Sequence, residues 1–468
     1  MLKRINVLFG AQDMTEGKPM SALLKFSIPL LIGNLAQQMY STVDSVIVGR
    51  YVGDKALSAI GTTLPIINLL LVLLMATSTG AGIMVAQYYG AKDKDSLSRS
   101  IGNAMTLVFI SSLLVMAVGI PLVSSLLKLT KTPVETFDMA RSYLTTILWG
   151  VLGLGFYNIV SGILRGLGNS VFPLLTLLLT SCLNVILDIW FVAGLDMGVT
   201  GAAWATIVSV AVSAVVCIVK LYRMRDVVRI DAENLIPCKK LTGQLLRLGL
   251  PAGVTQAIFS MSMVFVQALA NSMGYQVVTC TTAVMRIDGF AMMPNFTFGM
   301  AIATFVGQNV GANRMDRVSQ GSRDMLKVSL ATSFVLVALL SIFGRYLIGM
   351  FTTTEDIINL GVRQIRILAV GYVAVAITQV YGGIMRGAGD TMPSMWISMF
   401  STVVIRVPLA YLLAWFTRSE THPQGSPDAL FFSLLISWVI GAISTYLWYR
   451  RGTWKSKSLI PSSAPLTA

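Results

Sequence analysis

Two aspartates within apolar stretches are the residues of this chain best suited to chemistry. Asp44 is the one charged residue between Phe26 and Val48, and Asp188 lies near the end of another long apolar run. A carboxylate inside a membrane-spanning helix costs about 2.5–3.5 kcal/mol even on the lenient insertion scale, so it needs a partner or a use. Asn184 precedes Asp188 by four residues and would therefore share its helix face.

The spacing predicts that these polar side chains lie at one depth. Asp44 is six residues and Asp188 eight residues before the charged end of its run, and Thr206 is about seven residues into the following run. At 1.5 Å per residue, all three positions are roughly 9–12 Å below the same surface. Carboxylate, amide and hydroxyl oxygens suit a proton or a hard cation such as Na⁺. The expected cation-coupling residues are Asp44, Asn184, Asp188 and Thr206, and a bound Na⁺ would contact the first three.

A structural alternative exists for each acid: Asp44 could reach the interface, and Asp188 could cap a helix end. If both carboxylates are buried together, their repulsion favours a protonated form of one of them.

The composition predicts an all-α integral membrane protein that positions these residues on helices. Of 468 residues, 55% are hydrophobic and 12% are charged, whereas soluble domains are about 25% charged. The net charge of +14 does not indicate nucleic-acid binding, because the charges cluster between apolar runs as topology signals do. The predicted spans are 24–48, 57–85, 101–126, 138–162, 171–194, 199–221, 245–270, 277–305, 325–350, 359–383, 393–416 and 430–449.

The distribution of Lys and Arg predicts the orientation. With the N-terminus inside, 24 of these residues lie on the inner side and nine on the outer side, while Arg286 and Arg406 lie within spans. We therefore expect both termini to be cytoplasmic in a multi-pass protein of the cell inner (plasma) membrane. The first 20 residues lack the apolar core of a cleaved signal peptide.

Three pairs of motifs indicate an internal repeat. Gln87 and Gln308 end the second and eighth spans in similar sequences, QYYGA and QNVGA, with an offset of 221 residues. Arg165 and Arg386 have the same offset in GILRGLG and GIMRGAG. The third pair is FSIP at 26–29 and LGLP at 248–251, followed by Gln37 and Gln256 respectively.

An even number of spans per repeat predicts two pseudo-symmetric six-helix bundles in parallel. The expected divisions are an N-terminal lobe at 1–221, a cytoplasmic linker at 222–246, a C-terminal lobe at 247–450 and a cytoplasmic tail at 451–468.

The second half of the chain departs from this symmetry in its charges. Phe265 and Val266 stand where Asp44 would recur, and Arg406 occupies nearly the place of Asn184 and Asp188. We expect Asp288 to face a central cavity and to pair with Arg406; the alternative is that each contacts backbone carbonyls or extends to the interface. The expected substrate-cavity residues are Gln37, Gln256, Arg286, Asp288, Met292, Asn295 and Arg406.

Catalytic and cofactor motifs are lacking in the sequence. The four cysteines have no metal-type spacing, and the one histidine, His422, lies in a polar segment without other ligand types around it. We expect neither an enzyme nor a bound cofactor; the small ions involved would be H⁺ or Na⁺.

These motifs resemble those of the multidrug and toxic compound extrusion (MATE) transporters. The similar segments are FSIPLLIGNLAQQMYSTVDSVIVGR, VAQYYGAK, VGQNVGAN, LRGLGNSVFP, MRGAGDTMP and LNVILD. The resemblance implies twelve helices in two lobes and export of cationic or amphipathic organic compounds in exchange for H⁺ or Na⁺. It also implies a cation site at Asp44, Asn184, Asp188 and Thr206. One branch of the family has an acid in the seventh helix, where this chain has Ser260, Met261 and Ser262.

The alternative within transport is a flippase for lipid-linked oligosaccharides or peptidoglycan precursors, and outside it a membrane-embedded enzyme or a channel. A pyrophosphate-binding cavity needs several cations, and Arg286 and Arg406 are the two arginines that the topology places well inside the membrane, away from the span ends. As partners we expect the lipid bilayer and small organic cations or amphipathic drugs, no nucleic acid, and a monomeric chain.

Overall fold

A computed structural model describes residues 10–130, 132–420 and 422–460. Within these ranges the chain is helical, and eleven helices are long and apolar enough to cross a membrane. A twelfth span consists of α5 and α6, which are bent by 52° relative to each other. The predicted fold class is confirmed.

The first-half elements are α2 (Pro19–Tyr51), α3 (Asp54–Gly90), α4 (Lys94–Leu129), α5 (Val134–Trp149), α6 (Val151–Gly166), α7 (Val171–Asp188), η1 (Ile189–Gly194), α8 (Gly198–Arg223) and η2 (Ala232–Leu235).

The second half repeats this order. Its elements are α9 (Lys239–Ser272), α10 (Tyr275–Gly311), α11 (Met315–Gly349), α12 (Glu355–Gly387), α13 (Met392–Met399), η3 (Phe400–Arg406), α14 (Val407–Phe416), α15 (Asp428–Arg451) and η4 (Thr453–Ser456). The first helical turns of α9 lie within the segment expected to be a linker, which leaves η2 and its flanks as the connection.

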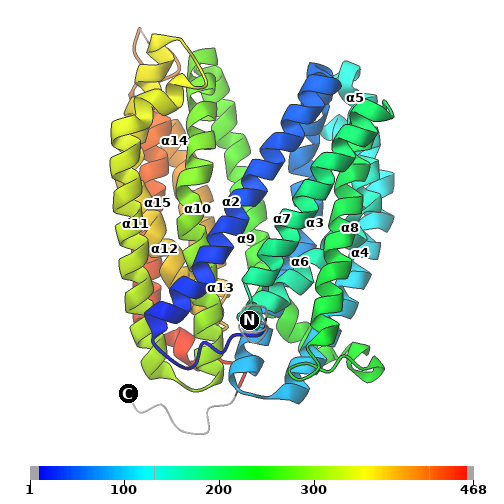
Figure 1. The fold of residues 1–468 in the computed structure, drawn as a ribbon. Coiled ribbons are helices and arrows are strands. Elements are labelled where there is room, and N and C mark those ends of the chain that lie inside the picture. The colour runs from blue at the N-terminus through cyan, green and yellow to red at the C-terminus, as the bar shows by residue number, and fades with distance from the viewer. Residues whose placement is uncertain (1–9, 131, 421, 461–468) are drawn as a thin grey trace.

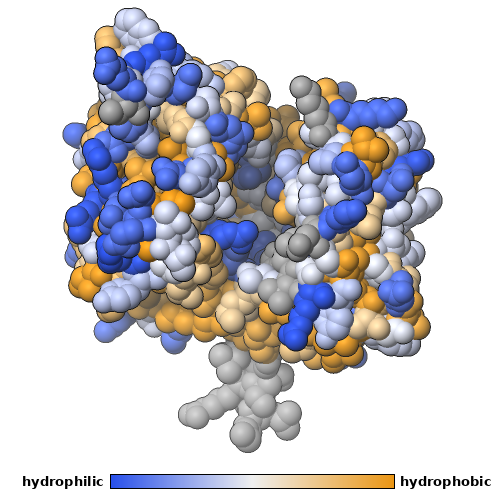
Figure 2. Space-filling view, turned by 90° about the horizontal axis from the view of Figure 1, so that it is seen from above, coloured by the Kyte–Doolittle hydropathy of each residue, from blue (hydrophilic) through white to orange (hydrophobic). Residues whose placement is uncertain are grey.

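The helices form two lobes that meet at one end and diverge at the other (Figure 1). We call α2–α8 the N-lobe and α9–α15 the C-lobe. The space-filling view from the open end shows a hollow between the lobes with hydrophilic residues inside it (Figure 2). The described ends of the chain lie at the end where the lobes meet (Figure 1).

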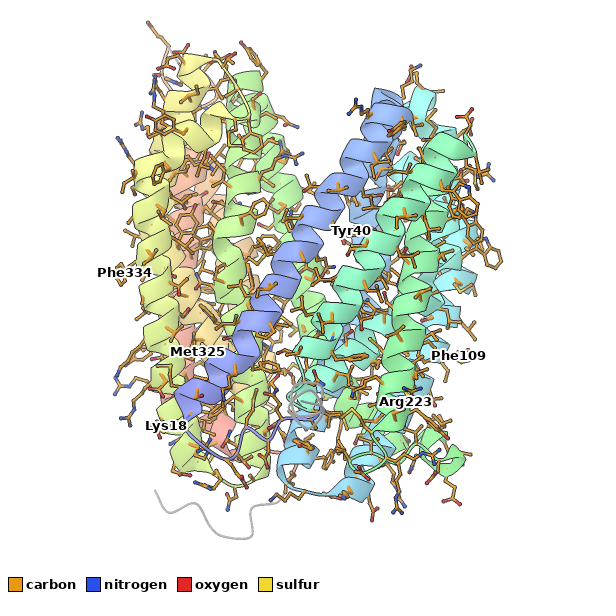
Figure 3. All side chains as sticks on the ribbon, in the orientation of Figure 1. Lys18, Tyr40, Phe109, Arg223, Met325 and Phe334 are labelled. Carbon is orange, nitrogen blue, oxygen red and sulfur yellow. The ribbon has the colours of Figure 1, made fainter. Side chains whose placement is uncertain are left out.

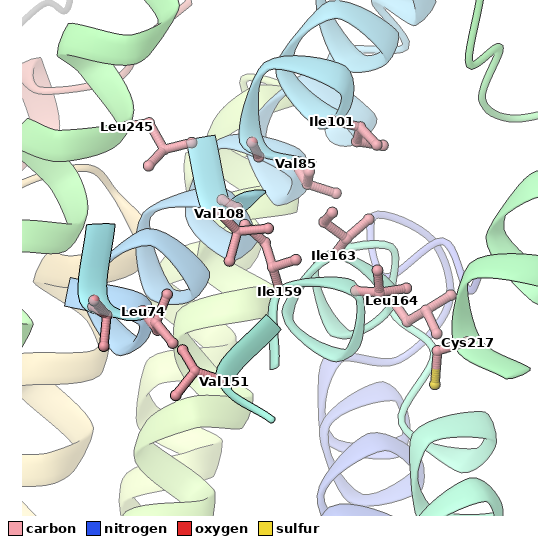
Figure 4. Close-up of a cluster of buried hydrophobic side chains, with 14 of the residues drawn as sticks. Leu74, Val85, Ile101, Val108, Val151, Ile159, Ile163, Leu164, Cys217 and Leu245 are labelled. Atoms are coloured by element: carbon pink, nitrogen blue, oxygen red, sulfur yellow. The ribbon is translucent and has the colours of Figure 1, made fainter. Parts of the chain in front are cut away.

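The first helix of each repeat packs against both lobes. In α2, Leu23 and Phe26 belong to a buried cluster with Phe298 and Phe305 of α10, while Val48 is buried in the N-lobe against α8. In α9, Leu245 is buried among residues of α3, α4 and α6 (Figure 4). A movement of one lobe relative to the other must therefore bend or tilt α2 and α9.

Glycines let the two lobes touch backbone to backbone where α3 meets α10. A Cβ atom at Gly90 would lie 1.9 Å from the carbonyl oxygen of Gln308, and one at Gly311 would lie 2.0 Å from the carbonyl oxygen of Gln87. Any larger residue at either position would force the helices apart. The contact is symmetric, since Gly90 and Gly311 are repeat-related.

The same two glutamines form reciprocal hydrogen bonds across the lobe interface. Gln87 Nε2 donates to the carbonyl of Gly387 at the end of α12, at 2.9 Å. Gln308 Nε2 donates to the carbonyl of Gly166 at the end of α6, also at 2.9 Å. Both glutamines are fully buried. Helix-terminal carbonyls lack hydrogen-bond partners within their own helix. Each glutamine supplies the missing donor for one such carbonyl in the opposite lobe. We call these two hydrogen-bonded glutamines the glutamine latch.

Backbone N–H groups near the two described ends of the chain donate hydrogen bonds to the side-chain amide oxygens of the latch glutamines. Gln308 Oε1 accepts a hydrogen bond from the backbone N–H of Met14 at 2.8 Å, and Gln87 Oε1 accepts one from that of Leu459 at 2.9 Å. Arg317 adds hydrogen bonds to the carbonyls of Met14, Glu16 and Gly17, at 3.0, 3.0 and 2.6 Å. Both described ends of the chain are therefore built into the closed end of the cleft.

The topology can be tested with two matched cysteine variants. Glu233 lies in the α8–α9 connection and Glu420 in the α14–α15 connection, at opposite ends of the molecule (Figure 1). Both side chains are exposed. In intact cells, a membrane-impermeant maleimide should label Glu420→Cys and should label Glu233→Cys only after permeabilisation. Labelling of both from the same side would contradict the topology.

Removal of either latch glutamine should loosen the closed end. Leaving a buried carbonyl without its donor costs about 1–3 kcal/mol. The population of molecules open at this end should therefore be about tenfold larger in Gln87→Leu or Gln308→Leu than in the wild type. The measurement is the alkylation rate of Ala86→Cys, because Ala86 is fully buried and faces Gly307 of the other lobe. Gln267→Leu is the matched control, since Gln267 is half-buried and its side-chain amide donates a hydrogen bond to Asn271 within α9. Equal alkylation rates in latch and control variants would show that the latch does not hold the lobes.

Candidate functional site

The structure brings the two predicted aspartates together inside the N-lobe. Asp44 lies in the outer half of α2 and Asp188 at the end of α7. Their carboxyl groups are within hydrogen-bonding reach of each other. Asp188 is fully buried and Asp44 partly buried. Asp188 does not cap a helix end as the structural alternative supposed, because the π-helical turn η1 follows it directly and its side chain makes no capping hydrogen bond.

The polar atoms around these carboxyls lack hydrogen-bond donors. Both carboxylate oxygens of Asp188, one of Asp44 and both amide atoms of Asn184 are buried without a partner in the described part of the chain. Asn184 is only 1% exposed. Buried polar groups are almost always hydrogen-bonded, and two adjacent carboxylates repel each other. A proton or a cation between them would satisfy these acceptors.

Two tyrosines that the sequence analysis did not select also border this site. The Tyr40 hydroxyl lies against that of Thr206, and Tyr40 is labelled on α2 in Figure 3. Tyr143 of α5 is 6% exposed and lies close to both carboxyl groups. The i, i+4 spacing of Tyr40 and Asp44 could have indicated the first of these. Nothing in the mixed polar and apolar sequence of α5 distinguishes Tyr143 as a residue of this site. We call Tyr40, Asp44, Tyr143, Asn184, Asp188 and Thr206 the acidic pocket.

The π-helical turn η1 follows Asp188 directly. A π turn shifts the helical phase by inserting a residue, and such turns are frequent at functional sites. Asn184 and Asp188 share one buried face of α7 through their i, i+4 spacing. The π turn changes the helical phase only for the residues after Asp188, among them exposed Trp190.

The expected ion pair between Asp288 and Arg406 is wrong. The carboxylate of Asp288 accepts a hydrogen bond from the hydroxyl of Tyr372 in α12. Arg406, which is 6% exposed, lies against the sulfur of Met263 in α9 at 3.9 Å. Asp288 thus faces α12 whereas Arg406 faces α9. In the described part of the chain, the ion pairs are Arg314–Asp316, Arg345–Glu355 and Arg363–Asp428, all with at least one exposed partner.

A cavity of about 450 Å³ lies between the lobes, in the halves of the helices nearer the latch. Of the expected cavity residues, it contains Gln256. Gln37 and Arg286 are exposed elsewhere on α2 and α10. Met292 packs at the edge of the C-lobe core. The amide of Asn295 is buried and bonded to the hydroxyls of Ser329 and Ser333, so it ties α10 to α11.

Comparison with known proteins agrees with this architecture. A family model described as MatE matches the chain twice, at residues 29–190 and 251–412. The chain belongs to the MatE family. The two matched segments correspond to the two repeats expected from the motifs.

Proteins with similar sequences are described as multidrug resistance proteins. A probable multidrug resistance protein, YoeA, of Bacillus subtilis is 26% identical over 443 residues, which cover 93% of this chain and 94% of that protein. A probable multidrug resistance protein, NorM, of Thermotoga maritima is 27% identical, with 84% and 85% covered.

Solved structures of MatE-type transporters have the same fold. A multidrug resistance MATE transporter in an outward-facing conformation has a TM-score of 0.87 and 26% identity, covering 95% of this chain and 97% of that one. A transporter of the MOP superfamily from Pyrococcus furiosus has a TM-score of 0.88 and 25% identity, covering 95% and 98%. That protein is described as having a binding pocket of reversed polarity that suggests a different function.

Neutralising either aspartate of the acidic pocket should abolish cation-coupled transport and leave the protein inserted. The loss of one charged contact, about 1.5–3 kcal/mol, corresponds to at least a tenfold lower rate of gradient-driven dye transport. The variants are Asp44→Asn and Asp188→Asn, assayed in proteoliposomes at matched protein amounts. Asp196→Asn is the control, because Asp196 is exposed in the same lobe. Coupled transport at the normal rate by both pocket variants would exclude these residues as the coupling site.

Proposed function

We propose that this MatE protein is a secondary active antiporter that exports amphipathic organic compounds in exchange for H⁺ or Na⁺. The observation that carries the proposal is the acidic pocket, where two carboxyl groups meet and three of their four oxygens are buried without a hydrogen-bond partner in the described part of the chain. Drug export is what the names of similar proteins describe. No catalytic constellation is needed for this function, and the protein would act as a transporter and not as an enzyme.

Helix α2 is the element that would connect cation binding to the movement of the lobes. Asp44 lies in its outer half, while its inner half is packed into the C-lobe cluster. Asn34, between these regions, donates a hydrogen bond to Thr297 of α10 at 2.9 Å. A cation that draws α2 towards α7 would strain these C-lobe contacts. Binding energy at the pocket would thereby shift the equilibrium between outward-open and inward-open forms.

The open end of the cleft would face outside. The predicted orientation places the termini in the cytoplasm, and the lobes are closed at the end that holds the termini (Figure 1). The similarity to a transporter described as outward-facing supports the same assignment. The protein would lie in the plasma membrane as a monomer.

A lipid-linked precursor flippase is the alternative within transport. The cavity of about 450 Å³ is within the range of sites for small organic ligands. This volume favours export of small compounds over movement of a lipid-linked oligosaccharide.

Transport in proteoliposomes with separately imposed gradients tests the proposal. The Na⁺ gradient and the pH gradient are imposed in separate experiments. We expect one of these gradients, imposed alone, to drive a fluorescent amphipathic dye against its own concentration gradient. Asp44→Asn should abolish this uphill movement. Dye flux that is independent of both gradients would indicate a channel. No uphill dye movement together with gradient-independent exchange of a labelled lipid-linked precursor would indicate a flippase.

A further inference from the structure

The cavity between the lobes contains cations and no acid. Among the described residues that line it, the charged ones are Arg165 and Arg386, which are repeat-related. Neither guanidinium takes part in an ion pair of the described chain. Both side chains are partly buried, and a partly buried guanidinium without an ion-pair partner favours water or an anionic group beside it. These two positive charges would repel an organic cation that carries no anionic group.

The two repeats differ in the space beside these arginines. Four residues before the arginine, the C-lobe has Gly382 where the N-lobe has Ser161. One residue after the proline shared by both repeats, the C-lobe has Ser394 where the N-lobe has Leu174. The C-lobe thus combines a missing side chain with an added hydroxyl.

These differences create a polar recess beside Arg386. A Cβ atom at Gly382 would lie 3.1 Å from Nη1 of Arg386 and 3.7 Å from Oγ of Ser394. The Ser394 hydroxyl is buried and has no hydrogen-bond partner in the described part of the chain. Ser394 lies in the first turn of α13, whose N-cap residue Thr391 makes no side-chain capping bond. A guanidinium, a free hydroxyl and the positive end of a helix therefore surround one small space.

The carboxylate nearest in sequence does not fill this recess. Asp390 follows Arg386 by one helical turn, but it accepts a hydrogen bond from Thr453 at 3.5 Å and faces the C-terminal segment. In the N-lobe, by contrast, Arg165 lies next to Tyr157 and Cys217. The recess is therefore specific to the C-lobe and open to the cavity.

We propose that Gly382, Arg386 and Ser394 bind the anionic group of the exported compound, namely a carboxylate, sulfonate or phosphate. This inference rests on the proposed export function and narrows its substrates to amphipathic compounds that carry such a group. The planar fork of the guanidinium suits two-point binding of these anions, and the Ser394 hydroxyl supplies a further donor. The absence of a Cβ at Gly382 lets the guanidinium and the hydroxyl lie close to the backbone of α12 at the wall of the cavity.

Two dyes that differ only in a carboxylate test the proposal. Rhodamine B has a free carboxylate, and its ethyl ester does not. Binding to the purified full-length protein is measured by fluorescence anisotropy, without any ion gradient. Rhodamine B should bind about tenfold more tightly than the ester, as a charge-assisted contact predicts. Arg386→Gln should remove this preference without weakening the ester, and Arg386→Lys should retain part of it.

Two further variants exchange the residues found at equivalent positions of the two repeats, and they test the proposal even if Arg386→Gln does not fold. Gly382→Ser places in the C-lobe the side chain that the N-lobe carries and should also abolish the carboxylate preference. Ser161→Gly, the reverse exchange in the N-lobe, should leave it intact. Equal affinities of the wild type for the two dyes, or a preference that survives both C-lobe variants, would overturn the proposal.

Two further arms separate the related hypotheses. If phosphatidylglycerol, but neither dye, shows binding that depends on Arg386, the recess binds a lipid headgroup and the assignment to a substrate is overturned. Uphill export of both dyes at equal efficiency in proteoliposomes would contradict the anion site and leave the antiport function standing. Absence of uphill export of either dye, with the carboxylate preference in binding retained, would contradict the antiport function alone.

Discussion

The close contact between α3 and α10 at one end of the molecule is the constraint on which the remaining architecture depends. Gly90 and Gly311 bring the backbones together, and Gln87 and Gln308 then satisfy helix-terminal carbonyls of the opposite lobe. With the lobes fixed here, their other ends diverge and the cleft opens on that side (Figure 1). The symmetry of the contact follows from the duplication, since every group in it has a counterpart in the other repeat.

The lobes share a scaffold but differ in the chemistry that they present. The N-lobe gathers unsatisfied acceptors around Asp44 and Asp188, which attract protons or metal cations. The C-lobe satisfies Asp288 through Tyr372 and exposes the cationic recess at Arg386. In the proposed mechanism, duplication followed by divergence separates cation binding, in the N-lobe, from substrate recognition, in the C-lobe. Helix α2, which packs into both lobes, is the physical link between the two.

Much of this could be predicted from the sequence, because membrane burial imposes simple rules. The constant rise of a helix set the depth of Asp44 and Asp188, and the structure places their carboxyl groups together. Depth, however, does not determine the direction in which a side chain points. Asp288 and Arg406 were therefore paired wrongly: η3 is π-helical, and its altered phase turns Arg406 towards α9.

The motifs that revealed the repeat were visible in the sequence, but their contacts were not. Gln87 and Gln308 mark equivalent helix ends, and nothing in one chain indicates that each reaches the other lobe. Tyr143 was missed for a similar reason, because the sequence of α5 does not indicate which of its polar residues face the acidic pocket. Contacts between segments distant in sequence depend on packing angles that the local pattern does not encode.

The attachment of both chain ends to the latch has a mechanical consequence. Met14 and Leu459 each donate a backbone hydrogen bond to a latch glutamine, so pulling on either end acts directly on the closed gate. A bulky fusion partner or a surface tether at a terminus would transmit force to these bonds. A chain without such attachments would therefore be the proper reference for its transport rate.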